Sequence, residues 1–278
     1  MNPHAHAAAA ARSFLFVPGD RPERFDKAWD SAADAVILDL EDAVAPHRKH
    51  EARLAVGAWL RDDRPVWIRC NAADTPWFGD DLALAAQPGV AGLLLPKAEA
   101  LPPELQRRVG AGLAWIPLIE TAVGIARART LAAEPGVVRL AFGAIDFQLD
   151  LGIDDDDALQ PFRAELVLAS RLAGCASPID GVTTAIDDEA AVRADARRAR
   201  RCGLHAKLCI HPRQLAAVHE AFSPSPDERA WAERVLAAAA AAQGAAVALD
   251  GKMIDKPVLL RAQRLAGAPA AGERLRRG

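Results

Sequence analysis

Eight short, strongly apolar runs recur along the first 210 residues, and they constrain the fold more than any other feature of the sequence. Most are almost continuously apolar, which is typical of strands buried on both faces of a parallel sheet. Segments with a helical pattern, such as residues 21–31 and 187–203, lie between them. The runs occupy residues 14–17, 35–40, 66–70, 91–95, 115–119, 137–142, 178–182 and 206–210.

This alternation predicts eight βα units, which suits a (β/α)8 TIM barrel over residues 13–222. A doubly wound open sheet is the alternative. It would need a glycine-rich phosphate loop after the first strand, and the sequence there, VPGDRP, is not GxGxxG. Residues 223–278 continue past the eighth unit as a helix, a hairpin around Asp250–Gly251 and a last short helix, so we expect a C-terminal appendage. We expect residues 1–12 to form a flexible arm.

Composition excludes several classes of protein. The 278 residues are 51% hydrophobic, which provides a full core and argues against disorder. A net charge of −3 gives no electrostatic case for binding nucleic acid or an anionic membrane. No run of about 18 strongly apolar residues is present, so we expect no membrane span. The four cysteines lack CxxC and zinc spacings, which indicates structural thiols and a reducing compartment such as the cytoplasm.

The carboxyl ends of the predicted strands carry an unusually polar set of side chains. In a barrel these ends form one rim, where the chemistry of such folds takes place. Charged groups gathered at a rim indicate a functional site, because buried charge is costly unless it is paired or used. The set comprises Asp20, Asp39, Glu41, Asp42, Arg69, Asn71, Lys97, Glu120, Asp146, Asp180 and His211.

Two carboxylates of this set, Glu120 and Asp146, follow neighbouring strands and could converge on one cation. With oxygen ligands and no His or Cys pair nearby, Mg²⁺ is the natural choice. Glu120 could equally be a helix first-turn acid stabilised by the helix dipole. The fork of Arg69 suits a carboxylate or an enolate-like oxygen, and the alternative is a structural ion pair with Glu41 or Asp39.

Two further groups have competing interpretations. Asp255 precedes Lys256–Pro257, and on the residues alone a cap of the last helix is the better interpretation. Arg21, Arg24 and Lys27 lie near the start of the first helix. They form either a solvated basic face or a site for phosphates.

The sequence also resembles the citrate lyase β-subunit-like branch of the HpcH/HpaI aldolase/citrate lyase family. The likeness spans roughly residues 13–266, and its motifs follow in that family's order. They are FLFVPGDRPERFDKAWDSAADAVILDLEDAV, VWIRCN, LLLPKAE, IPLIETAVGI, AFGAIDFQLDLG, SPIDGV, GLHAKLCIHPRQ and DGKMIDKPVLLRAQRL.

The resemblance implies a TIM barrel with a C-terminal lid over residues 223–278 and Mg²⁺ held by Glu120 and Asp146. It also implies that Arg69 binds substrate beside Glu120, and that Arg21, Arg24 and Lys27 contact the phosphates of coenzyme A (CoA). In the similar malyl-CoA and citramalyl-CoA lyases, the Asp of an MIDxP motif is catalytic. Asp255 in KMIDKP matches it, which replaces the capping interpretation. The lid of one subunit there covers its neighbour's site, which implies a homo-oligomer, commonly a trimer.

One departure selects the branch. The aldolases of this family carry a catalytic His in a D-x-E-H pattern, and this chain has Asp42 in its place. We therefore predict a lyase acting on a malyl-, citramalyl- or citryl-CoA-type thioester. The alternatives are a malyl-CoA-type thioesterase, a citrate lyase β subunit acting on an acyl carrier protein, and a non-catalytic binding protein.

Overall fold

The eight predicted strands form one closed barrel in the computed structural model, which describes residues 3–109, 112–241, 247–270 and 273. All neighbouring strands are parallel, and β1 pairs with β8 to close the ring. The TIM-barrel prediction is confirmed. The strands are β1 (Ser13–Pro18), β2 (Ala35–Asp39), β3 (Val66–Arg69), β4 (Val90–Leu95), β5 (Trp115–Ile119), β6 (Arg139–Phe142), β7 (Ala176–Asp180) and β8 (Ala206–Cys209).

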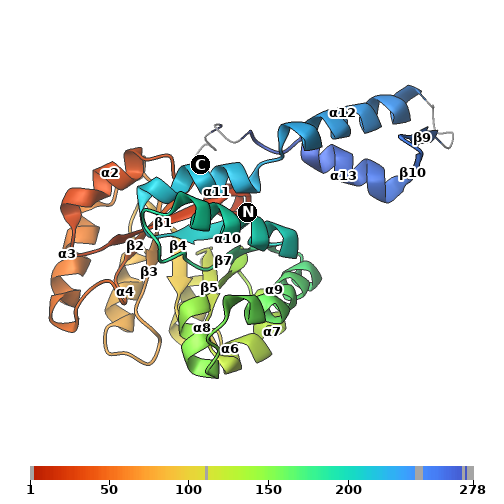
Figure 1. Cartoon of the computed structure of the whole chain (residues 1–278). Helices are drawn as coiled ribbons and strands as arrows, with labels where there is room; N and C mark the ends of the chain where they lie inside the picture. The colour runs from red at the N-terminus through yellow and green to blue at the C-terminus, as the bar shows by residue number, and fades with distance from the viewer. Residues whose placement is uncertain (1–2, 110–111, 242–246, 271–272, 274–278) are drawn as a thin grey trace.

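Each strand is apolar on both faces because each face meets a different core. Alternate residues such as Phe14, Ile37 and Trp67 fill the barrel interior. Their neighbours, such as Leu15 and Val36, pack against the surrounding helices. Figure 1 shows these helices around the sheet. They are α2 (Phe25–Asp30), α3 (Lys49–Trp59), α4 (Phe78–Leu84), α5 (Pro103–Val109), α6 (Ala122–Ala126), α7 (Ala128–Ala132), α8 (Ala144–Leu151), α9 (Gln160–Ala173), α10 (Glu189–Cys202) and α11 (Leu215–Phe222).

The amino-terminal segment differs from the flexible arm that we expected. Residues Pro3–Ala10 form helix α1, and Ala5 and Ala8 are buried against the barrel. Arg139, at the start of β6, donates hydrogen bonds to the carbonyls of Ala8 (3.0 Å) and Ala11 (2.8 Å). These contacts place α1 across the amino-terminal end of the barrel, opposite the rim that the carboxyl ends of the strands form.

The C-terminal extension consists of α12 (Pro226–Ala241), a hairpin of β9 (Val247–Leu249) and β10 (Lys252–Ile254), and α13 (Lys256–Ala266). Figure 1 shows that these elements project away from the barrel. The extension has a small core of its own, formed by Ala232, Val235 and Ala262. None of the helices in the described part of the chain is long and apolar enough to cross a membrane.

Candidate active site

Arg69 is held at the rim by two carboxylates. Asp39 and Arg69 are direct partners in the β2–β3 ladder, so the register of the sheet brings them together. The Arg69 Nε and Nη2 atoms donate to the two Asp39 oxygens at 2.7 and 2.5 Å, and Nη1 lies 2.9 Å from Glu41 Oε2. Both terminal nitrogens carry a second N–H that these contacts leave for a ligand. The ion pair and a substrate-binding role are therefore compatible.

Glu120 is a buried carboxylate next to this arginine. It follows β5, is 3% exposed, and its Oε1 accepts the backbone N–H of Lys97 at 2.7 Å. Burial raises its pKa to about 8, and the negative charges of Glu41 and Asp146 contribute to the rise. Gly143 follows the neighbouring strand, and a Cβ there would lie 2.4 Å from Glu120 Oε2. The glycine in AFGAID therefore makes room for the carboxylate.

Asp146 lies in the first turn of α8 and is half-buried. Glu41 is 5% exposed, and burial raises its pKa to about 7. Its Oε2 contacts Arg69 as an ion pair and has no hydrogen bond in the described part of the chain. The rim thus gathers several carboxylates around one buried glutamate.

These carboxylates fit Mg²⁺. A divalent cation would compensate the excess of buried negative charge that these carboxylates carry. No set of three or more His, Cys, Asp or Glu side chains in the described residues forms a complete metal cage. Mg²⁺ commonly uses only one or two carboxylates and keeps several waters. Glu120 and Asp146 can supply that number.

Lys97 has an unusual backbone that sequence analysis did not anticipate. Its φ of 48° is in the left-handed region, which few residues other than glycine occupy. This conformation accompanies the hydrogen bond from its N–H to Glu120. Its Nζ lies 4.0 Å from Glu41 Oε1. From the sequence, Glu41 was expected at the rim as a possible ion-pair partner of Arg69, and the structure shows that pair. Lys97 was expected at the rim only because it follows a predicted strand.

Two of the three predicted phosphate-binding residues line a common cavity. A cavity of about 420 Å³ between the ends of β1 and β8 is bordered by Arg24, Lys27 and His211. Arg21 is not among its lining residues, and its side chain lies 3.9 Å from Asp20. The cavity opens beside the rim because β1 and β8 end there.

Asp255 is not brought to the rim of its own barrel. It caps α13 by accepting the backbone N–H of Val258 at 3.0 Å, as the residues alone suggested. It is exposed and follows the hairpin that Figure 1 shows far from the barrel.

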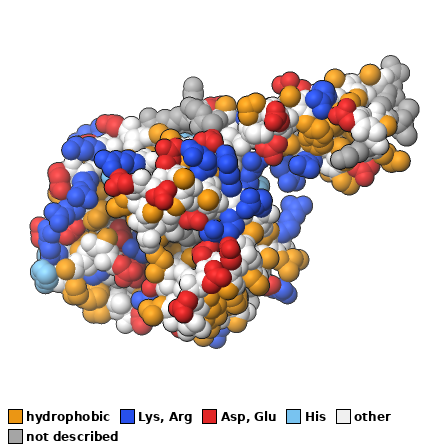
Figure 2. All heavy atoms as spheres, viewed as in Figure 1, with side chains coloured by type: hydrophobic (Ala, Val, Ile, Leu, Met, Phe, Trp, Pro, Cys, Tyr) orange, Lys and Arg blue, Asp and Glu red, His pale blue; other side chains and the backbone are white. Residues whose placement is uncertain are grey.

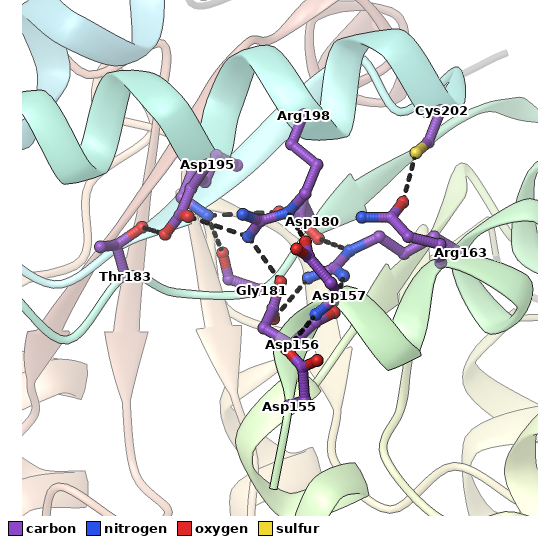
Figure 3. A network of polar contacts seen from close by, with 12 residues as sticks. Asp155, Asp156, Asp157, Arg163, Asp180, Gly181, Thr183, Asp195, Arg198 and Cys202 are labelled. Carbon is purple, nitrogen blue, oxygen red and sulfur yellow. Dashed lines mark hydrogen bonds and ion pairs between the residues drawn. The ribbon is translucent and has the colours of Figure 1, made fainter. Parts of the chain in front are cut away.

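Asp180 does not belong to the rim set. Figure 3 shows it beside Arg163, within a network between the sheet and helices α9 and α10. Its oxygens accept from Arg163 at 2.8 Å and from Lys207 at 3.3 Å. Burial alone would raise the pKa of the Asp180 carboxyl, but the positive charges of Lys207 and Arg163 hold this pKa below its usual value. Asp156 joins the same network through Arg163 and Arg198.

Comparison with known proteins agrees with this geometry. The model of the HpcH/HpaI aldolase/citrate lyase family matches residues 12–212. A citrate lyase subunit beta-like protein of Deinococcus radiodurans is 39% identical, with 92% of this chain and 96% of that protein covered. A (3S)-malyl-CoA thioesterase of Cereibacter sphaeroides is 36% identical, with 96% and 97% covered. The crystal structure of CitE from Mycobacterium tuberculosis with magnesium, acetoacetate and coenzyme A superposes with a TM-score of 0.83. It is 37% identical and covers 95% of this chain and 100% of its own.

Proposed function

Because the chain belongs to the HpcH/HpaI aldolase/citrate lyase family, we propose that it is a Mg²⁺-dependent carbon–carbon lyase. It cleaves, reversibly, a 3-hydroxy-3-carboxyacyl-CoA thioester to acetyl-CoA and a 2-oxo acid. The observation that carries this proposal is the buried Glu120 carboxylate. It lies close enough to Asp146, Glu41 and Arg69 for their charges to shift its pKa. The structure of CitE from Mycobacterium tuberculosis with magnesium, acetoacetate and coenzyme A supports it.

Each residue of the site has a separate role in the proposed cleavage. Glu120 and Asp146 would hold Mg²⁺, which would supply Lewis-acid stabilisation to oxygens of the substrate. A base takes the hydroxyl proton, the carbon–carbon bond breaks, and the 2-oxo acid separates from the enolate of the acetyl thioester. The free N–H groups of Arg69 stabilise the enolate oxygen in a site with little water. Asp255 then protonates the enolate carbon, or removes a methyl proton in the condensation direction.

Because Asp255 lies far from the rim of its own barrel, we propose that the extension acts as a lid on a neighbouring subunit. The direction of the extension supports this proposal. The extension leaves the barrel on the side of α1, opposite the rim, and so carries Asp255 away from its own rim. Met253 and Leu260, on either side of Asp255, are 70% and 49% exposed. Figure 2 shows hydrophobic side chains on this extension. Ile145 and Leu149 on α8, beside Asp146, are also exposed and suit such a contact.

The basic residues and the cavity support a CoA thioester as the substrate. Arg24 and Lys27 line the cavity between β1 and β8, and they would meet the phosphates of CoA. A contact of Arg21 with these phosphates stays a prediction. An acyl carrier protein offers a similar prosthetic arm, and its acyl thioester is the alternative substrate. We expect no nucleic acid or membrane among the partners, and a cytoplasmic location stays a prediction.

Thioester hydrolysis is the second candidate, because the similar protein of Cereibacter sphaeroides is a (3S)-malyl-CoA thioesterase. The products separate the two reactions. Purified protein with Mg²⁺ is incubated with malyl-, citramalyl- and citryl-CoA, and mass spectrometry follows the products. Acetyl-CoA with a matching 2-oxo acid, abolished by EDTA, supports the lyase. Free CoA with an intact hydroxy acid supports the thioesterase. Turnover of none of the three esters contradicts both reactions on CoA esters, and the carrier-protein form is then assayed.

A further inference from the structure

The two ends of the C-terminal extension meet at one buried side chain, that of Arg12. This residue lies just before β1 and is 4% exposed. Its Nη1 donates to Ser223 Oγ at 3.2 Å, where the extension begins. The same atom donates to the carbonyl of Ala270 at 2.9 Å, and Nη2 donates to the carbonyl of Glu273 at 2.6 Å. Both of these carbonyls lie beyond α13, where the extension ends.

The guanidinium is itself fixed to the barrel by Asp34. Arg12 Nε donates to Asp34 Oδ2 at 3.1 Å, and the backbone N–H of Arg12 donates to the same oxygen at 2.9 Å. The backbone N–H of Asp34 donates to Ser13 Oγ at 2.9 Å, and that hydroxyl lies 2.8 Å from Nε2 of His219 on α11. Since every group here is buried and hydrogen-bonded, the anchor has little freedom to move.

We propose that Arg12 is a positioning residue that sets the direction of the extension and thereby the place of Asp255. The proposal rests on the proposed function, in which Asp255 acts on a neighbouring subunit's site. Two further contacts support the base of the extension. Arg229 donates to the carbonyl of Ala268 at 3.0 Å, and Arg200 of α10 pairs with Glu228 at 2.8 Å. Only Arg12, among the described residues, is hydrogen-bonded to both ends of the extension and to the start of the barrel.

The length of α12 sets the size of the effect on the position of Asp255. Helix α12 has 16 residues and is therefore roughly 24 Å long, so a rotation of about 10° at its base moves its far end by about 4 Å. A misplacement of about 1 Å can cost a catalytic step up to roughly 100-fold. We therefore expect loss of the anchor to lower kcat at least 10-fold. The KM should change little, because the residues proposed to bind the thioester lie on the barrel.

The test removes the carbonyls that Arg12 binds and leaves the Arg12–Asp34 pair intact. One variant ends at Ala268, and the matched control ends at Leu275 and keeps Ala270 and Glu273. Arg12→Gln is the second variant. Hydrogen–deuterium exchange is measured on peptides covering residues 223–229 and 256–268, with the strands of the barrel as internal reference. Steady-state kinetics with the best thioester follow for each variant.

We expect faster exchange at the base of the extension in the Ala268 variant and unchanged protection of the strands. The kcat should fall at least 10-fold with KM within about 2-fold, and the Leu275 control should match the full chain. Unchanged exchange in the Ala268 variant overturns the anchor, and increased exchange with unchanged kcat overturns the positioning role. If Arg12→Gln also loses protection in the strands, its result is set aside and the truncation decides. If the full chain turns over no thioester, the proposed function fails, while exchange still decides whether Arg12 holds the extension.

Discussion

At the rim, Glu120 carries an energetic cost that its proposed role explains. Its pKa is raised to about 8 in the folded chain, against an ordinary value of 4.5. The native state therefore binds this proton more tightly than the unfolded state does. The stability that it contributes is complete below about pH 4.5 and is lost as the pH rises to about 8. At neutral pH and above, a buried carboxylate without a cation thus destabilises the metal-free protein.

Glu120→Gln tests this cost directly. We expect the metal-free variant to gain on the order of 3 kcal/mol over the wild type at pH 8.5, and much less at pH 4.5. Urea unfolding at both pH values in EDTA measures the difference. Mg²⁺ should raise the Tm of the wild type and leave that of the variant unchanged, with the exposed Glu233→Gln as the control. Equal stabilisation of Glu120→Gln by Mg²⁺ would remove Glu120 from the metal site.

The left-handed backbone at Lys97 gives a second prediction at this scale. Asn tolerates this conformation and keeps the N–H that Glu120 accepts, whereas the β-branched Val does not fit it. We expect Lys97→Val to cost roughly 1–3 kcal/mol of unfolding free energy and Lys97→Asn less than about 1 kcal/mol. Chemical denaturation of the two variants measures this. Equal losses would mean that the backbone strain is not what distinguishes them.

At the scale of elements, Arg139 explains why the amino-terminal segment is a helix against the barrel. This side chain is fully buried at the foot of β6, and no carboxylate pairs with it in the described residues. It donates instead to the carbonyls of Ala8, Ala11 and Ser177. Burial lowers its pKa to about 9. The carbonyls at the end of α1 therefore replace water as hydrogen-bond acceptors for the Arg139 guanidinium. These hydrogen bonds hold α1 against the barrel.

Arg139→Met should therefore loosen α1 and destabilise the barrel. The substitution removes the Arg139 donor from the buried carbonyls of Ala8 and Ala11 and from the half-buried carbonyl of Ser177, and we expect a loss of about 3 kcal/mol. Guanidinium unfolding provides the measurement. The matched control is Arg129→Met, which breaks a pair with Glu165 that is more than half exposed on the arginine side. It should cost less than about 1 kcal/mol. A similar cost for both variants would contradict the role assigned to Arg139.

At the scale of the whole molecule, the proposed site is divided between subunits. Glu120 lies at the rim, whereas Asp255 lies on an extension that leaves the opposite side of the barrel. Two inactive variants should therefore restore each other when mixed. Asp255→Asn supplies an intact rim, and Glu120→Gln supplies an intact Asp255.

We expect each variant alone to lose most turnover and a remixed 1:1 oligomer to recover about a quarter of wild-type activity, since about a quarter of the sites combine both intact residues. The assay follows acetyl-CoA after joint refolding or co-expression. Mass measurement of the intact oligomer confirms that mixing occurred. Mixed oligomers without activity would place Asp255 in its own subunit's site or outside the reaction.

The sequence by itself determined the barrel, because eight apolar runs separated by helical patterns leave few other ways to bury their faces. It also determined that Glu120, Asp146 and Arg69 share a rim, because they follow strands that are all parallel. It named Glu41 and Asp39 as alternative partners of Arg69, and the register of the sheet decided that Asp39 lies directly beside it. It placed Asp180 at the rim, whereas alternation along β7 turns that side chain toward the helices.

Only the tertiary structure decided how the amino-terminal segment packs and which direction the C-terminal extension takes. An alanine-rich start has no pattern that predicts packing, and its helix depends on Arg139, which lies more than a hundred residues away. The extension was predicted as helix, hairpin and helix, but its direction depends on Arg12 joining residues separated by more than 250 positions. Local pattern encodes which elements form, because it records how each segment buries its own apolar face. Contacts between distant segments depend on how all the elements pack together, and no local pattern contains that information.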